Sequence, residues 1–367
     1  MSIIRETISI GDRSITLETG RVAKQAGGSV LVQCGDTVVL VTACGAPHER
    51  PGIDFFPLTC DYLEKTFAAG KIPGGFFKRE GRLRDEEVLV ARLMDRPIRP
   101  LFPKGFKNET QVIATVLSAD RINPPDVLAM TGASAALTLS DIPFEGPVVG
   151  IRVSRIEGRF VAYPTFQEME QSELDLIVSV SKDAIVMVEG GAAQARESVI
   201  IDALMFAHES AQPLLRLQDQ LREVGQRKRA VVPPPKDEAL AARVRAVSLD
   251  ETRAAETIPA KIERYARIRE IEEKLLATMA GEYPDRAGEV RAAYDSMRKK
   301  LVRDRILDEG KRIDGRGPTD IRPITCEVGV LPRVHGSALF TRGETQAVVP
   351  TTLGTSKDEQ KIDNLMG

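Results

Sequence analysis

The chain has 367 residues, of which 42% are hydrophobic and 28% charged, a composition typical of a globular protein and unlike that of a disordered one. Its 51 Lys and Arg are balanced by 53 Asp and Glu, so the net charge of -2 gives no overall sign of nucleic-acid binding, and any such surface must be local. The four cysteines and three histidines lack the spacing of a zinc site or a disulfide framework, and the length predicts two to three domains.

The N-terminal residues lack the apolar core of a signal peptide, and no later run reaches the roughly 18 apolar residues that span a bilayer. These features predict a cytoplasmic protein without membrane contact.

Residues 1–230 are expected to form the first domain, of α+β or mixed α/β class, because strands and helices do not alternate strictly. A small-residue segment, Val127–Leu139, predicts a buried helix with Asp126 as its N-cap, and a second helical block extends from Ala195 to about Arg229. Runs of β-branched and apolar residues predict strands, and the last two of these are expected to pair across a Lys-Asp turn. The strands span residues 3–10, 14–17, 29–32, 37–43, 111–118, 148–156, 174–181 and 184–189.

Residues 62–107 form a locally basic segment. They contain 11 Lys and Arg against six Asp and Glu, a net charge of +5 in a chain whose total is -2. Within them, a stretch rich in Gly and Pro precedes a run of aromatic and basic residues. This run includes Phe76, Phe77, Lys78, Arg79 and Arg82.

Successive residues of an extended chain point to opposite sides, so at least one of Phe76 and Phe77 is expected to be exposed. An exposed ring beside cations suits single-stranded nucleic acid, because a base stacks on the ring while the cations neutralise phosphates. In the alternative, the two rings pin the loop to the domain and the basic side chains are only solvated. The residues by themselves leave both interpretations open.

A helix is predicted over Asp85–Arg96, with acidic residues in its first turn and basic residues in its last. Arg92 and Arg96 are four residues apart and share a face. Pro97 is expected to end this helix and to leave Arg99 in a stiff extended segment. In the alternative to a binding role, Arg96 and Arg99 pair with nearby acids, namely Asp85, Glu86 or Asp95.

Beyond three consecutive prolines, residues 237–309 are rich in Ala, Glu, Arg, Leu and Lys and predict an all-helical domain that ends at Gly310. The residues that follow repeat part of the first domain. Shifted by 308 positions, residues 336–345 match residues 28–37 without a gap and are identical at five of ten positions. Both copies predict a β-hairpin with a Gly-acid-Thr turn, so residues 312–367 are expected to be the start of a second, incomplete copy.

The sequence contains no phosphate-binding loop, dinucleotide-binding fingerprint, zinc-protease motif or nucleophile elbow. Asp-rich metal clusters are also absent from the sequence. No catalytic or metal-binding residue is therefore assigned.

Four segments resemble the bacterial polynucleotide phosphorylase family: residues 54–59, 67–82, 91–103 and 335–346. The resemblance implies two ribonuclease PH-like domains joined by an all-helical domain, assembled as a ring-shaped homotrimer. It also implies a phosphorolytic 3′-to-5′ exoribonuclease that acts on single-stranded RNA in mRNA degradation and RNA processing.

The same resemblance implies inorganic phosphate as co-substrate, Mg²⁺ as cofactor and an RNA-degrading complex with an endoribonuclease or a helicase. It places the residues from the basic loop at the narrow entrance of a channel, where they grip RNA, and two further arginines near the RNA path. These residues are Phe76, Phe77, Lys78, Arg79 and Arg82, followed by Arg96 and Arg99.

In that family the phosphate-binding and metal-binding residues lie later in the second ribonuclease PH-like domain. Catalytic residues and Mg²⁺ ligands are therefore expected beyond residue 367. Two hypotheses follow: the sequence is part of an active exoribonuclease, or it is a non-catalytic module for RNA binding and trimer assembly.

Overall fold

The computed structural model describes residues 2–53, 55–73, 80–232, 237–359 and 364–365. Four of the predicted binding residues, Phe76, Phe77, Lys78 and Arg79, lie outside the described residues. The chain divides into two compact units, Met1–Pro234 with Lys361–Gly367, and Pro235–Gln360. Each unit is described by itself.

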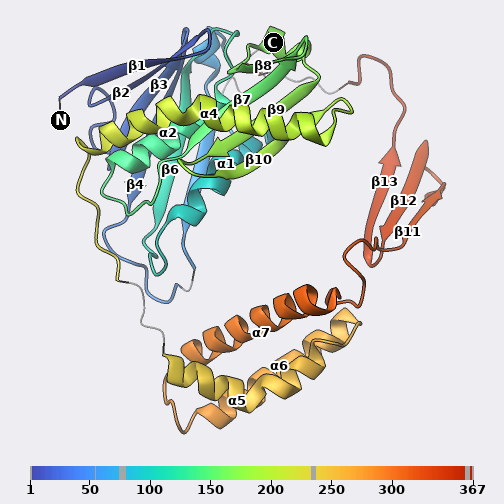
Figure 1. The fold of residues 1–367 in the computed structure, drawn as a ribbon. Coiled ribbons are helices and arrows are strands. Elements are labelled where there is room, and N and C mark those ends of the chain that lie inside the picture. Colours follow the sequence, from blue (N-terminus) through green and yellow to red (C-terminus); the bar gives the residue numbers. More distant parts are fainter. Residues whose placement is uncertain (1, 54, 74–79, 233–236, 360–363, 366–367) are drawn as a thin grey trace. The chain divides into compact units, whose positions relative to one another are not determined.

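Unit 1 contains a six-stranded sheet in the order β1-β2-β3-β4-β6-β5 (Figure 1). All neighbours are antiparallel except β5 and β6, which run parallel. Five of its strands were predicted, whereas β5 was not, because only Leu58 and Tyr62 of its seven residues are buried and the apolar pattern is weak. The strands are β1 (Ile4–Ile10), β2 (Arg13–Thr19), β3 (Gly28–Cys34), β4 (Thr37–Gly45), β5 (Leu58–Glu64) and β6 (Thr110–Ser118).

A second, four-stranded antiparallel sheet in unit 1 has the order β10-β9-β7-β8. The predicted pairing across Lys182-Asp183 is confirmed, since β9 and β10 are antiparallel neighbours. The short strand β8 and the five-residue helix α3 (Phe166–Glu170) were not predicted. The strands are β7 (Val149–Ile156), β8 (Arg159–Ala162), β9 (Leu174–Val180) and β10 (Ile185–Ala192).

Helix α2 (Asp126–Leu139) forms the centre of the unit 1 core, and every residue after Asp126 is buried. It packs against β3, β4 and β7, and a Cβ on Gly132 would lie 2.5 Å from a methyl of Val41. The small residues of this helix therefore permit its close approach to the sheet. Asp126 is not the N-cap as predicted: Pro125 occupies that position, and Asp126 begins the helix with its carboxylate accepting from Val127 N at 2.7 Å.

Helix α4 (Glu197–Arg222) lies beside α2 and ends seven residues before the predicted end at Arg229. The segment after it binds the end of α2 instead. Gln226 N donates to the Leu139 carbonyl, and Lys228 Nζ donates to the Ser140 carbonyl at 2.6 Å. These bonds satisfy carbonyls at the end of α2, which a longer α4 would leave without those partners.

Helix α1 (Asp85–Ile98) continues past the proline that was expected to end it. Pro97 lies within its last turn, and Arg99 is helical rather than extended, with φ -54° and ψ -43°, at the start of a 3₁₀ turn, η2 (Arg99–Leu101). Both the Arg99 N–H and its guanidinium bind Asp95, and this i,i+4 contact holds the turn in helical form.

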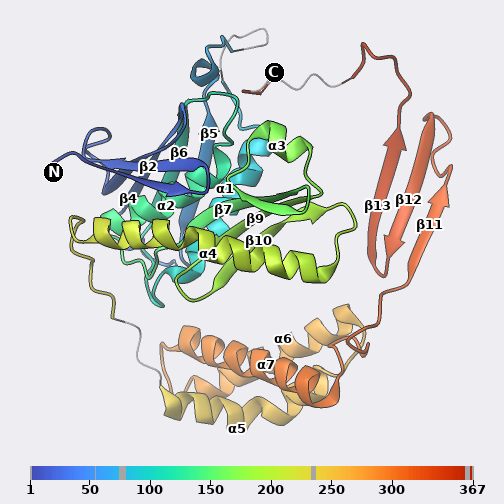
Figure 2. The same cartoon turned by 45° about the horizontal axis from the view of Figure 1, so that its top comes forward.

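Unit 2 contains three helices, α5 (Glu238–Ala255), α6 (Lys261–Met279) and α7 (Ala287–Glu309), which confirm the all-helical prediction (Figure 2). They enclose a small core that includes Val244, Ile268, Leu275 and Tyr294. Gly310 ends α7 in the left-handed conformation at φ 63°. Within the described ranges, no helix has the length and hydropathy required to cross a bilayer.

Unit 2 also contains a three-stranded antiparallel sheet of β11 (Ile324–Val328), β12 (Gly336–Arg342) and β13 (Thr345–Thr351). The hairpin β12–β13 corresponds residue for residue to β3–β4 at the predicted shift of 308, with Gly336 opposite Thr351 as Gly28 lies opposite Ala43. Gly35 and Gly343, in the two turns, both have positive φ, at 57° and 61°. The predicted repeat of this hairpin is therefore confirmed.

Candidate functional site

The predicted binding segment connects β5 to α1. After β5, the chain forms a 3₁₀ turn, η1 (Thr66–Ala69), and turns at Gly70 in the left-handed conformation at φ 69°. The described chain resumes at Glu80 and enters α1 at Asp85. The geometry of the site is therefore given by the two ends of the segment.

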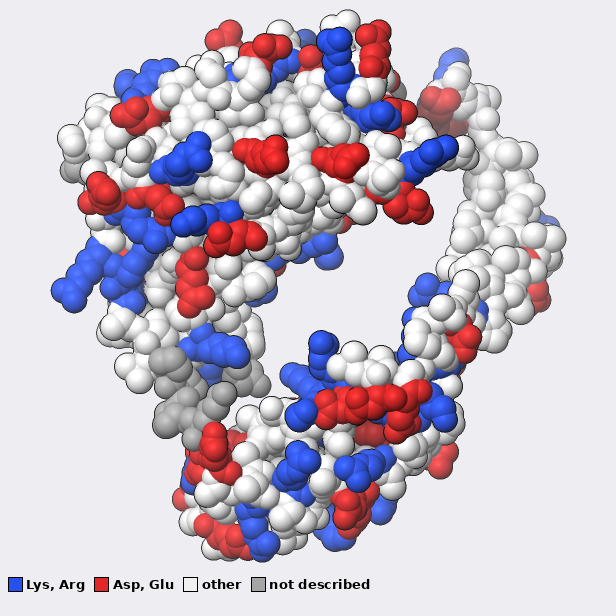
Figure 3. All heavy atoms as spheres, in the orientation of Figure 1, with Lys and Arg blue, Asp and Glu red and all other residues white. Residues whose placement is uncertain are grey.

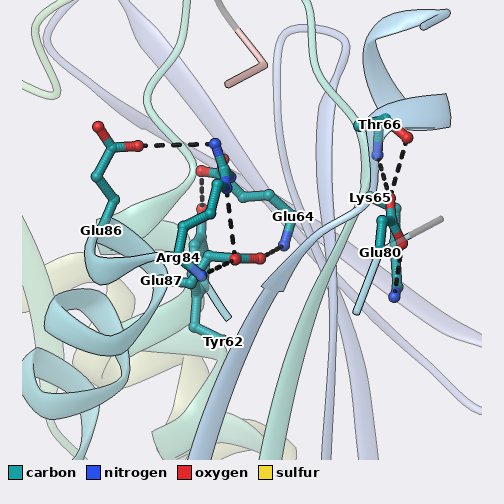
Figure 4. A network of polar contacts seen from close by, with 8 residues as sticks. All are labelled: Tyr62, Glu64, Lys65, Thr66, Glu80, Arg84, Glu86 and Glu87. Atoms are coloured by element: carbon teal, nitrogen blue, oxygen red, sulfur yellow. Dashed lines mark hydrogen bonds and ion pairs between the residues drawn. The ribbon is translucent and has the colours of Figure 1, made fainter. Parts of the chain in front are cut away.

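Glu80 ties the second end of this segment to the first. Its carboxylate accepts from Thr66 N at 2.7 Å, from Thr66 Oγ1 at 3.0 Å and from Lys65 Nζ at 2.9 Å (Figure 4). Partial burial by itself raises the pKa of Glu80, but these donors outweigh it and hold the pKa below the ordinary value of a glutamate. Glu80 therefore stays ionised and bound at neutral pH.

Arg84 and Glu87 form a second tie between β5 and α1. The buried Glu87 carboxylate accepts from Glu64 N at 2.8 Å and from Arg84 N at 2.7 Å, and the Arg84 guanidinium pairs with Glu64 (Figure 4). The Tyr62 hydroxyl donates to Glu64 at 2.9 Å. Partial burial lowers the pKa of Arg84, but its pairing with Glu64 outweighs this and raises it. The second end of the segment is thus anchored twice, by Glu80 on Lys65 and Thr66 just after β5, and by Arg84 and Glu87 on Glu64 at the end of β5.

The three described members of the predicted binding set have different surroundings. Arg82 is exposed and has no ion-pair or hydrogen-bond partner among the residues that the structure describes. Arg96 pairs with Glu189 of β10 at 2.5 Å, and Arg99 pairs with Asp95 at 2.6 Å and donates to the Leu58 carbonyl. The hydrogen bonds to Asp95 raise the pKa of Arg99.

Arg99 therefore makes the structural pair that the sequence offered as an alternative. The partner of Arg96, however, was not foreseen. The Arg96–Glu189 pair is about half exposed, a setting in which an ion pair contributes little to stability, whereas Asp95 in the Arg99 pair is only 25% exposed. Whether these arginines bind RNA stays a prediction.

Arg92 is a candidate that the predicted set left out. It is exposed on α1, one helical turn before Arg96, and has no ion-pair partner among the residues with described positions. The signal was available in the i,i+4 spacing of the two arginines. Among the described residues of this region, Arg82 and Arg92 are thus two exposed arginines without an ion-pair partner.

A pocket of about 250 Å³ lies beside the Arg84 cluster, lined in part by Tyr62, Glu64, Val90 and Phe166. The chain itself contributes Leu365 to this pocket, and that side chain is only 6% exposed. Lys71 Nζ donates to the neighbouring Asn364 carbonyl at 2.8 Å. Residues 364–365 therefore pack against the first end of the binding segment.

The described residues offer no further reactive cluster: no group of three or more His, Cys, Asp or Glu side chains is placed to hold a metal ion. Burial raises the pKa of Cys34 to about 11, and burial also raises the pKa of Cys60. These two thiols stay protonated at neutral pH and are poor nucleophiles.

Family models match most of the chain. The model described as 3′ exoribonuclease family, domain 1, matches residues 11–143 and 320–366, and domain 2 of the same family matches residues 146–210. The model described as polyribonucleotide nucleotidyltransferase, RNA binding domain, matches residues 239–317. The domain 1 model matches two separate regions, and each of them contains one copy of the repeated hairpin.

Curated relatives are similar over nearly the whole chain. A polyribonucleotide nucleotidyltransferase of Sorangium cellulosum is 58% identical over 99% of this chain and 49% of its own length. One of Geobacter sulfurreducens is 54% identical over 98% of this chain and 52% of its own. The chain thus spans about half the length of the curated relatives it matches.

Among solved structures, a chain of the Archaeoglobus fulgidus exosome with RNA bound to the active site aligns with 60% of this chain and 89% of its own length. The identity is 18% and the TM-score 0.44, a likeness too low to establish a relation between the two folds.

Proposed function

Because the chain belongs to the polyribonucleotide nucleotidyltransferase family, we propose that it forms the RNA-gripping part of a phosphorolytic 3′-to-5′ exoribonuclease. In this reaction inorganic phosphate attacks the terminal linkage of single-stranded RNA and releases a nucleoside diphosphate. The observation that supports the proposal most is the identity of 58% over 99% of the chain.

The proposal assigns RNA binding to the segment between β5 and α1. The two phenylalanines, Phe76 and Phe77, supply rings on which bases stack, while Lys78 and Arg79 neutralise phosphates. The anchored ends of the segment support this assignment, since a segment whose ends are already held together loses less entropy when it binds. Arg82 supports it too, because it is exposed and has no ion-pair partner among the described residues.

The remaining parts of the proposal concern the whole protein. Mg²⁺ would stabilise charge on the phosphoryl oxygens, and its ligands are proposed to lie outside residues 1–367. A cytoplasmic homotrimer that works in mRNA degradation and RNA processing, in a complex with an endoribonuclease or a helicase, belongs to the same proposal.

The charge distribution of this chain favours RNA binding by a few local side chains over attraction of RNA by the net charge of the surface. Lys and Arg are interspersed with Asp and Glu over the visible face, and the chain carries a net charge of -2 (Figure 3). RNA is therefore expected to be held by a few specific side chains rather than by the field of the whole surface.

Replacement of both Phe76 and Phe77 by Ala is expected to weaken binding of a fluorescent oligo(A) by about 2–6 kcal/mol, because each ring stacks on a base. Fluorescence anisotropy of the parent and variant chains measures this loss. Phe67, an exposed ring on η1 outside the predicted set, provides the matched control, and Phe67→Ala is expected to bind as the parent does. Equal affinity of the double variant and the parent for oligo(A) would contradict stacking and favour the alternative in which both rings pin the loop to the domain.

For the 367-residue chain by itself we expect RNA binding without turnover, as in the hypothesis of a non-catalytic module. Oligo(A), inorganic phosphate and Mg²⁺ are mixed with the chain, and nucleoside diphosphate is measured by chromatography. Release above the level of a protein-free control would show that the reacting groups lie within these residues.

A further inference from the structure

A pocket of about 440 Å³ lies at the end of α1 that is opposite to the loop between β5 and α1. At the loop end, Arg84 pairs with Glu64, the last residue of β5. At the other end, Arg99 lines the pocket and donates to the carbonyl of Leu58, the first residue of β5. Because α1 has 14 residues and a helix rises about 1.5 Å per residue, the two ends are roughly 20 Å apart. The pocket is therefore separate from the loop.

The lining of this pocket combines aromatic and basic side chains. Of the nine described residues that line it, four are phenylalanines, three are Lys or Arg, and none is Asp or Glu. This local excess of positive charge contrasts with the whole chain, in which 51 Lys and Arg are balanced by 53 Asp and Glu. The volume lies within the range that is usual for ligand sites. The composition favours a ligand that is both anionic and planar.

Three of the four phenylalanines form a packed cluster. The ring centroids of Phe56 and Phe102 are 4.5 Å apart, and those of Phe102 and Phe106 are 6.0 Å apart with nearly parallel planes. Phe102 and Phe106 are buried, so this cluster belongs to the core of unit 1. Phe55 differs, because it is 64% exposed where it lines the pocket. Core packing therefore accounts for three of the rings and leaves the Phe55 ring accessible to a ligand.

Two of the basic residues hold the backbone on either side of Phe55. Lys107 Nζ donates to the Ile53 carbonyl at 3.3 Å, two residues before the ring. Arg99 Nη1 donates to the Phe56 carbonyl at 3.4 Å, one residue after it. The exposed ring is thus presented by a backbone that is held by side chains from the connection between α1 and β6.

The third basic residue, Lys104, differs from these two. It is exposed at the pocket and has no hydrogen-bond or ion-pair partner among the residues whose positions are described. Its ammonium group is therefore available to a phosphate. An exposed ring beside an unpaired cation is what single-stranded nucleic acid requires, because a base stacks on the ring while the cation neutralises the backbone.

We propose that this pocket is a second contact site for single-stranded RNA, in which a base stacks on Phe55 and Lys104 binds a phosphate of the same strand. Arg99 and Lys107 act as positioning residues that hold the backbone around the ring. This inference rests on the proposed function, which supplies RNA as the ligand. It adds a site about one helix length from the loop.

A tryptophan in place of Phe55 tests the stacking directly. The chain contains no Trp, so Phe55→Trp introduces a single indole whose fluorescence reports on this pocket alone. We expect oligo(A) to quench this fluorescence, because a base stacks on the indole. Ile201→Trp is the matched control, since Ile201 is exposed on α4 and does not line the pocket. We expect no quenching at that position.

Binding of a fluorescent oligo(A) of about 16 nucleotides to the full chain, measured by anisotropy, gives the size of the effect. We expect Phe55→Ala to weaken binding by roughly fivefold or more, the least expected when one stacked base is lost. Phe55→Tyr keeps the ring and is expected to bind as the parent does. A loss of equal size in Phe55→Tyr and Phe55→Ala would contradict stacking.

The dependence of binding on salt tests the role of Lys104. Lys104→Ala is expected to make the slope of log K against log salt shallower by about 0.7, the contribution of one phosphate of a single strand. Phe55→Ala should leave the slope unchanged. Lys182→Ala is the matched control, because Lys182 is an exposed lysine in the turn between β9 and β10, outside the pocket, and should also leave it unchanged. An unchanged slope in Lys104→Ala would overturn the phosphate contact.

Replacement of Phe76 and Phe77 by Ala separates this inference from the proposed function. If that replacement weakens binding but saturating oligo(A) does not quench Phe55→Trp, the second site is wrong and the proposed function stands. If Phe55→Trp is quenched while the replacement has no effect, the second site stands and the proposed role of the loop fails. If neither effect is seen, both fail. Quenching of equal size in Ile201→Trp would also overturn the second site.

Thermal unfolding distinguishes loss of contact from loss of fold. Phe55 and Lys104 are exposed, so Phe55→Ala and Lys104→Ala are expected to unfold close to the parent temperature. Unfolding of Phe55→Ala at the assay temperature would show that the ring stabilises the fold, and it would contradict the role in RNA binding.

Discussion

Asp120 illustrates how a single carboxylate holds the loops of unit 1 together. It accepts hydrogen bonds from Thr37 Oγ1 at 2.9 Å and Ile122 N at 2.7 Å, and also from Asp36 N and from the backbone and side chain of Asn123. Partial burial by itself raises the pKa of Asp120, but the donors outweigh it and lower its pKa below 3.8. The carboxylate therefore stabilises the fold in its ionised form.

Asp120→Asn is expected to lower the free energy of unfolding of unit 1 by about 1–3 kcal/mol at neutral pH. The NH₂ group of the asparagine cannot accept the hydrogen bonds that one carboxylate oxygen of Asp120 accepts, so some of these N–H and O–H donors lose their acceptor. A carboxylate whose pKa is lowered on folding stabilises the protein above its unfolded pKa, and this contribution is lost as the pH falls through the folded pKa. The difference between parent and variant should therefore shrink below about pH 4. Urea unfolding followed by circular dichroism across this range measures it, and a difference that stays constant with pH would contradict the assignment.

Sequence reasoning at this scale succeeded where partners are close along the chain. The pair of Arg99 with Asp95 was among the alternatives because the two residues are one helical turn apart. The partner of Arg96, Glu189, is 93 residues away and comes near it only through packing of α1 near β10, which no local pattern encodes. The contacts of Glu80 with Thr66 were unpredictable for the same reason.

Because the hairpin β12–β13 repeats β3–β4, equivalent residues of the two hairpins can be compared directly. Val41 of β4 and Val349 of β13 occupy equivalent positions, but Val41 is fully buried against α2 whereas Val349 is 52% exposed. Val41→Ala is expected to cost about 1–3 kcal/mol of the free energy of unfolding, because it leaves a cavity in the core. Val349→Ala is expected to change it by less than about 0.5 kcal/mol.

Hydrogen exchange resolved by peptide reports the stability of each hairpin separately. Equal losses of unfolding free energy for Val41→Ala and Val349→Ala would contradict the prediction that only the buried valine contributes to the core.

The elements that sequence predicted best are those with a strong pattern, such as the buried helix α2 and the strands β3 and β4. The errors fall at element ends and in weakly patterned strands. Pro97 did not end α1, because the contacts of Arg99 with Asp95 hold the last turn, and α4 stopped early, because Gln226 and Lys228 bind the end of α2. In each case a tertiary or capping contact outweighed a local preference.

At the scale of the whole molecule, the internal repeat and the helical insert could be predicted from sequence, and the structure and the family models agree with both. The gap-free match at a shift of 308 succeeded because a hairpin constrains its register and its turn residues together. The assignment of RNA binding depended on resemblance, since residue chemistry left stacking and anchoring equally open for Phe76 and Phe77.

The central claim is that the loop between β5 and α1 holds single-stranded RNA, and photo-crosslinking tests it most directly. A 5-bromouridine oligonucleotide is irradiated with the chain, and crosslinked tryptic peptides are identified by mass spectrometry. Trypsin cleaves after Lys71 and Lys78, so we predict crosslinks on the peptide of residues 72–78, which contains both rings, and their loss under excess unlabelled RNA. Specific crosslinks confined to other peptides, such as those of residues 237–309, would contradict the account.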